Sequence, residues 1–165
     1  MKSDKLPGTL IVICGLPYSG KTTHAQQIEA ERNALRLCPD EWIEEILPED
    51  WSRAELDRLR DPVESIQWKL AKRVLSLGID VVLEWGSWGR SERDALRAGA
   101  REIGAGFELV YLDVPLEVLV DRLHRRNSTK QKGTFAISED ELRHWWHRFE
   151  RPTEEELGNV WTSSK

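Results

Sequence analysis

The sequence reads Gly15-Leu16-Pro17-Tyr18-Ser19-Gly20-Lys21-Thr22 near its amino end. This run matches G-x-x-x-x-G-K-T, the pattern of a phosphate-binding loop, or P-loop. In such a loop the backbone N–H groups curl around a phosphate chain, the lysine reaches the β- and γ-phosphates, and the last hydroxyl ligates Mg²⁺. The sequence therefore predicts a nucleoside triphosphate site from Gly15 to Thr23.

The two flanks of this loop agree with the prediction. Leu10 to Cys14 is a continuous apolar run, typical of a buried parallel strand. The residues after Lys21 follow a helical pattern, and the positive end of a helix dipole favours bound anions. Strand, loop and helix thus occur in the order that the motif requires.

Three further apolar runs, at residues 35–38, 79–84 and 107–112, alternate with helical patterns. Alternation of this kind indicates βαβ units, and therefore an α/β fold with a parallel sheet between helices on both faces. We expect three layers in a single domain over residues 1–165. At Asp61-Pro62-Val63-Glu64 the residue types predict a helix start, with Asp61 as its N-cap.

The helix predicted to begin there carries Ile66, Leu70, Val74 and Leu77 at a helical spacing, so we expect these side chains to be buried. Cys14 and Cys38 lie at the ends of predicted strands. They favour reduced, buried thiols of a cytoplasmic protein, with a disulfide as the alternative.

The composition limits the partners that we expect. The chain of 165 residues has a net charge of −5, which argues against binding to long nucleic acid, although a local basic patch stays open. No apolar run approaches the length of a membrane span, and the first residues lack the apolar core of a signal peptide. We expect a cytoplasmic protein.

Asp40 follows the second predicted strand, at the sheet edge where ligands of parallel sheets bind. A carboxylate there can accept a proton from a substrate hydroxyl or order a magnesium-bound water. The alternative is that Asp40 caps a helix beginning at Glu41.

Glu84 ends the third strand and could hold Mg²⁺ through water, or be an ordinary carboxylate at a strand end. The residues after it supply candidates for substrate contacts, namely Trp85, Trp88, Arg90 and Arg93, together with Trp42 from the second strand's flank. The tryptophans could stack on a substrate or pack in the core, and the arginines could clamp an anion or lie in solvent.

Arg122 and Arg126 lie four residues apart on one face of a predicted helix that enters a polar segment. Guanidinium groups neutralise charge on a transferred phosphoryl group, and a closing lid would bring them in, so we predict a small lid near residues 126–137. Cations also favour helix C-termini, which is the alternative. His144 and His147 lack a third ligand nearby and do not predict a metal site.

The chain resembles the small P-loop kinases of the zeta-toxin, chloramphenicol-phosphotransferase and polynucleotide-kinase type, AAA-like predicted kinases of bacteria. The match rests on the loop Gly15 to Thr23, Asp40, Leu112-Asp113-Val114-Pro115, Arg122 to Asn127, and the stretch from Phe149 to Glu156.

This resemblance implies a nucleoside-kinase-like fold and the use of ATP and Mg²⁺. It implies that Asp40 is the base and that Arg122 and Arg126 are lid arginines. One departure is that Glu41 to Glu45 is acidic where polynucleotide kinases of this group commonly carry an arginine.

We therefore expect an ATP-dependent phosphotransferase that moves the γ-phosphoryl group to a hydroxyl of a small molecule. An antibiotic or a sugar-like metabolite would suit the acidic, tryptophan-rich flank. Two alternatives stay open: a kinase of nucleic-acid 5′-hydroxyl groups, and a module that binds ATP or GTP without transferring phosphate.

Overall fold

A computed structural model describes residues 6–47, 52–129 and 137–158 of the chain. Its elements, in chain order, are β1 (Thr9–Cys14), α1 (Lys21–Arg32), β2 (Leu35–Leu37), α2 (Pro39–Ile46), α3 (Arg53–Leu75), β3 (Val81–Gly86), α4 (Arg90–Glu102), β4 (Gly106–Tyr111), α5 (Leu116–Ser128), α6 (Glu139–Arg148) and α7 (Glu154–Gly158).

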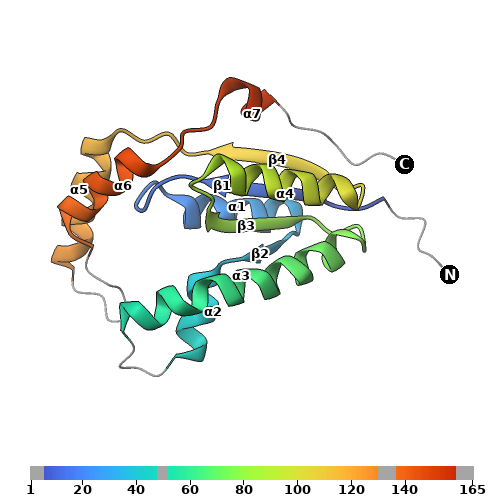
Figure 1. Cartoon of the computed structure of the whole chain (residues 1–165), viewed down its shortest axis with the longest axis horizontal. Helices are drawn as coiled ribbons and strands as arrows, with labels where there is room; N and C mark the ends of the chain where they lie inside the picture. The colour runs from blue at the N-terminus through green and yellow to red at the C-terminus, as the bar shows by residue number, and fades with distance from the viewer. Residues whose placement is uncertain (1–5, 48–51, 130–136, 159–165) are drawn as a thin grey trace.

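The four strands form one sheet in the order β2-β3-β1-β4, and every neighbouring pair is parallel. Figure 1 shows helices on both sides of this sheet, with the strands pointing towards α5 and α6. The three-layer α/β fold predicted from the alternating pattern is confirmed. Parallel strands share the edge at which they end, so residues that follow β1, β2 and β3 meet there.

Alternation along β1 explains the layers, because successive side chains of a strand point to opposite faces. Leu10, Val12 and Cys14 pack with residues of α3 and α4 on one face. Ile11 and Ile13 pack with Ala25 of α1 on the other face. β1 is therefore buried on both faces in the middle of the domain. It fixes the position of the loop that follows it at the carboxyl end of the sheet.

The prediction of a helix start at Asp61 was wrong. A single helix, α3, runs from Arg53 to Leu75 with Pro62 inside it. It begins at a capping box in which the Ser52 hydroxyl accepts from the backbone N–H of Glu55, and the Glu55 carboxylate accepts from the N–H of Ser52. An exposed proline loses one backbone hydrogen bond, and the packing of α3 on α2 and β3 outweighs that loss.

The predicted buried face of this helix was wrong for three of its four residues. Ile66, Leu70 and Leu77 are exposed, whereas Val74 is partly buried and packs against the core. The buried residues of α3 are Val63, Gln67, Ala71 and Leu75, which follow the same spacing on another face. Both sets of residues fit a helical period. The set that packs against the sheet is the one with the smaller side chains, Ala71 among them.

Helices α5 and α6 pack together beyond the carboxyl ends of the strands (Figure 1), around Leu119, Leu123 and Leu142. The lid predicted near residues 126–137 falls largely on residues 130–136, which lie outside the described residues. Cys14 and Cys38 are free and buried, and burial raises the pKa of each thiol to about 12. Within the described ranges, no helix combines the length and apolarity needed to cross a membrane.

Candidate functional site

The P-loop connects the end of β1 to the start of α1. Tyr18 and Gly20 have φ values of 65° and 95°, so the backbone turns through left-handed conformations within three residues. A side chain at Gly15 would place its Cβ 2.8 Å from the hydroxyl of Ser19. The loop is therefore a tight cradle that only glycine at position 15 permits.

Ser19 supplies a direct indication that this cradle suits a ligand. Its hydroxyl is buried and has no hydrogen-bond partner among the described residues. A buried polar group without a partner is costly, and phosphate oxygens would satisfy it. The backbone of residues 15–20 and this hydroxyl together fit a phosphate chain.

Lys21 lies in the same cradle, folded onto the loop itself. Its ammonium donates to the carbonyl oxygens of Gly15 at 3.0 Å and Leu16 at 2.8 Å. Burial lowers the pKa of Lys21 to about 8, and the carboxylates of Glu84 and Asp40 oppose that shift. The lysine therefore lies within the field of both candidate carboxylates, and a phosphate would exchange its carbonyl partners for a full counter-charge.

Glu84 and Thr22 lie together, as expected for a magnesium site. The Thr22 hydroxyl donates to the Glu84 carboxylate, whose side chain is only 5 % exposed. The other oxygen of Glu84 accepts from Nη1 of Arg36 at 2.7 Å.

Arg36 is a site residue that the sequence analysis missed. A cation within an apolar strand, Leu35-Arg36-Leu37, requires buried carboxylates as partners, and this signal could have identified it. Arg60, which pairs with Asp40 across twenty residues, carried no such local signal.

Asp40 lies in the first turn of α2, interacts electrostatically with Lys21, and pairs with Arg60 of α3. Its side chain is 51 % exposed, so solvent or a substrate can reach it. The helix begins at Pro39 with Cys38 as its N-cap residue, so the alternative that Asp40 caps a helix starting at Glu41 is wrong. An acid in the first turn still gains from the helix dipole.

Both predicted lid arginines reach the P-loop. Nη1 of Arg122 donates to the carbonyl oxygen of Tyr18 at 2.9 Å. The guanidinium of Arg126 lies 5.8 Å from the centre of the Tyr18 ring. The neighbouring Arg125 instead pairs with Asp121 on the helix surface. The structure thus brings Arg122 and Arg126 to the loop, and their role in catalysis stays a prediction.

Arg93 was a candidate for clamping an anion, and that prediction was wrong. Its side chain is fully buried, its Nε donates to the Glu156 carboxylate at 2.9 Å, and its Nη1 donates to the carbonyl oxygens of Ser87 and Trp88. A buried guanidinium with these partners has no capacity left for a substrate. The pair joins α4 to α7.

Arg90 is partly exposed and pairs with Asp94 and Glu155, which would compete with any bound anion. Its contact with a substrate stays a prediction.

The three candidate tryptophans have packing roles in the structure. Trp42 and Trp85 pack against the core of the sheet, and the Trp85 indole donates to Gln67 at 2.9 Å. Trp88 contacts Trp145 of α6, with ring centres 5.6 Å apart. These contacts explain the placement of the three side chains. Each is only partly buried, and stacking on a substrate stays a prediction.

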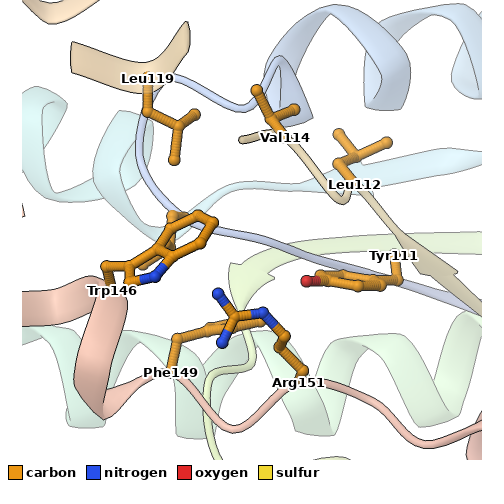
Figure 2. A pocket seen from close by; sticks show the side chains of 8 residues that line it. Tyr111, Leu112, Val114, Leu119, Trp146, Phe149 and Arg151 are labelled. Carbon is orange, nitrogen blue, oxygen red and sulfur yellow. The ribbon is translucent and has the colours of Figure 1, made fainter. Parts of the chain in front are cut away.

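A small hollow lies next to Leu16 of the P-loop, and Figure 2 shows the side chains that line it. It is lined by aliphatic and aromatic side chains of β4, α5 and the end of α6, and the guanidinium of Arg151 lies 4.3 Å from the Trp146 ring centre. Neither Asp40 nor Trp85 lines it. The hollow is therefore separate from Asp40, the predicted base, and from Trp85, a candidate for contact with the substrate.

The oxygen donors of Thr22 and Glu84 match the ligand needs of Mg²⁺. Mg²⁺ takes hard oxygen ligands, and at phosphate sites it uses one or two protein groups with waters and phosphate oxygens. One hydroxyl and one carboxylate that already touch each other fit this description. Over the described part of the chain, no three His, Cys, Asp or Glu side chains gather as a metal cluster.

A family model described as an AAA domain matches residues 10–152, most of the chain. The chain belongs to this AAA domain family. No curated protein matches the sequence.

Solved structures share the fold at low identity. A chain of the Pnkp1/Rnl/Hen1 RNA repair complex superposes with a TM-score of 0.68 and 21 % identity, covering 90 % of this chain and 46 % of that one. This chain thus spans about half the length of that relative. A gluconokinase from Sinorhizobium meliloti 1021 superposes with a TM-score of 0.60 and 24 % identity. The match covers 92 % of this chain and 79 % of that one.

The Mycobacterium tuberculosis APS kinase CysC, solved with AMPPNP and APS, gives a TM-score of 0.62 at 21 % identity and covers 90 % of this chain and 86 % of that one. These relatives and the family model confirm the resemblance to small P-loop kinases. Identities this low show a shared fold, and the acceptors of those proteins do not transfer to this one.

Proposed function

We propose that this protein is an ATP- and Mg²⁺-dependent phosphotransferase that moves the γ-phosphoryl group of ATP to a hydroxyl of a small molecule. An antibiotic or a sugar-like metabolite is the acceptor class that we favour. The proposal rests on one observation. Thr22 and Glu84 are hydrogen-bonded at the P-loop, and the exposed carboxylate of Asp40 lies at the same sheet edge and interacts electrostatically with Lys21.

Each residue then has a chemical task. The loop N–H groups, the Ser19 hydroxyl and Lys21 bind the phosphates, and Thr22 and Glu84 would hold Mg²⁺. When bound, Mg²⁺ would neutralise phosphate charge. Asp40 accepts the proton of the acceptor hydroxyl as the new oxygen–phosphorus bond forms and the bond to the β-phosphate oxygen breaks.

Two lid arginines and the ion-pair partner of Asp40 complete this scheme. Arg122 and Arg126 already contact Tyr18, so they can neutralise charge on the group in transfer. Arg60 pairs with Asp40 and keeps its carboxylate in one orientation. ADP and the phosphorylated acceptor are the products.

The acidic character of the wall around Asp40 supports a neutral or cationic acceptor. Glu64 and Glu92 interact electrostatically with each other and with Arg60, and Glu64 also interacts with Asp40. Burial raises the pKa of Glu64 to about 7, against the opposing effect of Arg60. Such a wall disfavours a second anion next to the base.

A kinase of nucleic-acid 5′-hydroxyl groups is the second candidate, because the RNA repair chain shares the fold with a TM-score of 0.68. The acidic residues Glu41, Glu44 and Glu45 next to Asp40 argue against a polyanion there. Arg36 is paired with Glu41, so its guanidinium is not free to bind the phosphates of a nucleic acid.

The test is phosphoryl transfer from labelled ATP with Mg²⁺ to a panel of antibiotics, sugars and a 5′-hydroxyl oligonucleotide. Asp40→Asn keeps the shape and removes the base, so transfer should fall by about 10²–10⁴-fold with ATP affinity unchanged. Asp61→Asn, an exposed acid beside Arg60, is the matched control and should keep transfer.

Each outcome separates the candidates. Full transfer by Asp40→Asn would remove Asp40 as the base. Preference for the oligonucleotide would favour the second candidate. Tight ATP binding without transfer to any acceptor would favour a nucleotide-binding module without catalysis.

A further inference from the structure

Arg36 connects carboxylates from three other elements of the fold. Its Nη1 donates to Glu84 of β3 at 2.7 Å, and its Nη2 donates to both oxygens of Glu41 of α2 at 2.7 Å. Its Nε reaches Glu29 of α1 at 3.4 Å. The Arg36 side chain is 11 % exposed, so water screens these contacts weakly.

The placement of these partners is informative. Glu84 accepts from Thr22, so one end of the network is the proposed magnesium site. Glu41 follows Asp40 directly in the first turn of α2, so the other end is the turn that carries the proposed base. One guanidinium therefore joins the donor side of the site to the acceptor side.

The chemistry of arginine suits this task. Its planar fork presents donors at fixed angles, so it orients two carboxylates at once, which a flexible lysine does poorly. Burial opposes the charge, but hydrogen bonds from Arg36 to Glu41 and Glu84 outweigh it and raise the pKa of Arg36. The group stays cationic, and it holds one oxygen of Glu84 while the other faces Thr22.

We propose that Arg36 is a positioning residue, which fixes the Glu84 carboxylate towards Thr22 for Mg²⁺ and, through Glu41, the turn of α2 that carries Asp40. The inference rests on the proposed function, because it assigns Arg36 a role at that same site. Arg36 touches no reacting atom and acts only through the two carboxylates.

The test measures ATP affinity by calorimetry, with saturating Mg²⁺ and again in EDTA, and takes the ratio as the magnesium-linked gain. In Arg36→Met this gain should fall by about 10–100-fold, as for other residues that orient metal ligands. ATP affinity in EDTA should stay within about twofold, because the P-loop is intact. The magnesium-linked gain of Arg36→Lys should lie between those of the wild type and Arg36→Met.

Arg32→Met is the matched control. Arg32 also joins two carboxylates, Asp80 and Glu108, but it lies at the end of α1, away from the P-loop. It should lower stability without changing the magnesium-linked gain. Glu41→Gln cuts only the link to α2, so it too should keep the gain while slowing transfer to an acceptor.

The outcomes are distinguishable. No magnesium-linked gain in the wild type would count against the proposed function itself. A wild-type gain that Arg36→Met preserves or increases would overturn the positioning role alone, as would an equal loss in Glu41→Gln. Should Arg36→Met fail to fold by circular dichroism, Arg36→Lys carries the test, and a wild-type gain in that variant overturns the proposal.

Discussion

The donor half of the site and the acceptor half are held in place by different kinds of contact. The phosphate cradle of the donor half is local, since Lys21 bonds to carbonyl groups five and six residues away. Glu84 and the lid arginines reach it from distant parts of the chain. The acceptor half depends on distant partners. Asp40 pairs with Arg60 across 20 residues, and Arg53 at the start of α3 pairs with Glu141 of α6 across 88.

This difference has a physical origin. A phosphate chain is the same in every nucleotide, and a short glycine-rich turn before a helix is enough to bind it. An acceptor pocket must fit one molecule, so its walls come from several elements. Sequence motifs therefore identify the phosphate cradle, while the partner that holds the proposed base Asp40 emerges only from the packing of α2 on α3.

The largest expected effect tests a long-range contact of the fold, the buried pair of Arg93 with Glu156. Arg93→Met leaves Glu156 charged and buried, and breaking such a pair costs about 3–5 kcal/mol of the free energy of unfolding. The variant also releases the carbonyl groups of Ser87 and Trp88. Thermal and urea unfolding measure the loss.

The double variant Arg93→Met/Glu156→Met is the control, because it removes both charges. It should recover most of the stability, since apolar side chains of similar volume often replace a buried ion pair without loss. A double variant as unstable as the single one would show that the pair is not the cause.

The next effect tests the local half. Lys21→Met removes the cation of the P-loop, and ATP turnover should fall by about 10²–10³-fold with little change in stability. Lys72→Met, which loses a surface contact with Trp68, should keep turnover. Equal turnover in the Lys21 variant would mean that the loop does not bind the transferred phosphates.

The smallest effect concerns Glu64 in the acceptor wall. Its pKa rises from 4.5 to about 7 on folding, mainly through burial, so the folded protein binds its proton more tightly than the unfolded chain does. Stability should therefore fall as pH rises between these two values, by on the order of 3 kcal/mol. Glu64→Gln removes the charge, so the variant should be more stable than the wild type at pH 8 and equal to it at pH 4.

Urea unfolding at both pH values checks this prediction. The exposed Glu102→Gln is the control and should unfold like the wild type at each pH. A stability difference between Glu64→Gln and wild type that does not vary with pH would contradict the proton linkage.

The outcome for the fold and the site follows the same division. The sheet, the loop and the contact of Thr22 with Glu84 were predictable, because each depends on a strand pattern or on a motif at a strand end. The burial of Arg93 was not predictable, since nothing near it in the sequence indicates that it pairs with Glu156. The exposed Ile66 shows the same limit, because α3 offers two apolar stripes and only the sheet selects between them.

The ion pair between Arg93 and Glu156 has a consequence for synthesis. Glu156 is among the last described residues of the chain, whereas Arg93 lies in the helix that follows β3. A ribosome therefore completes the P-loop, the sheet and α4 long before the carboxylate that neutralises Arg93 emerges. Until then Arg93 lacks its counter-charge, so the packing around this guanidinium is completed only when α7 has been made.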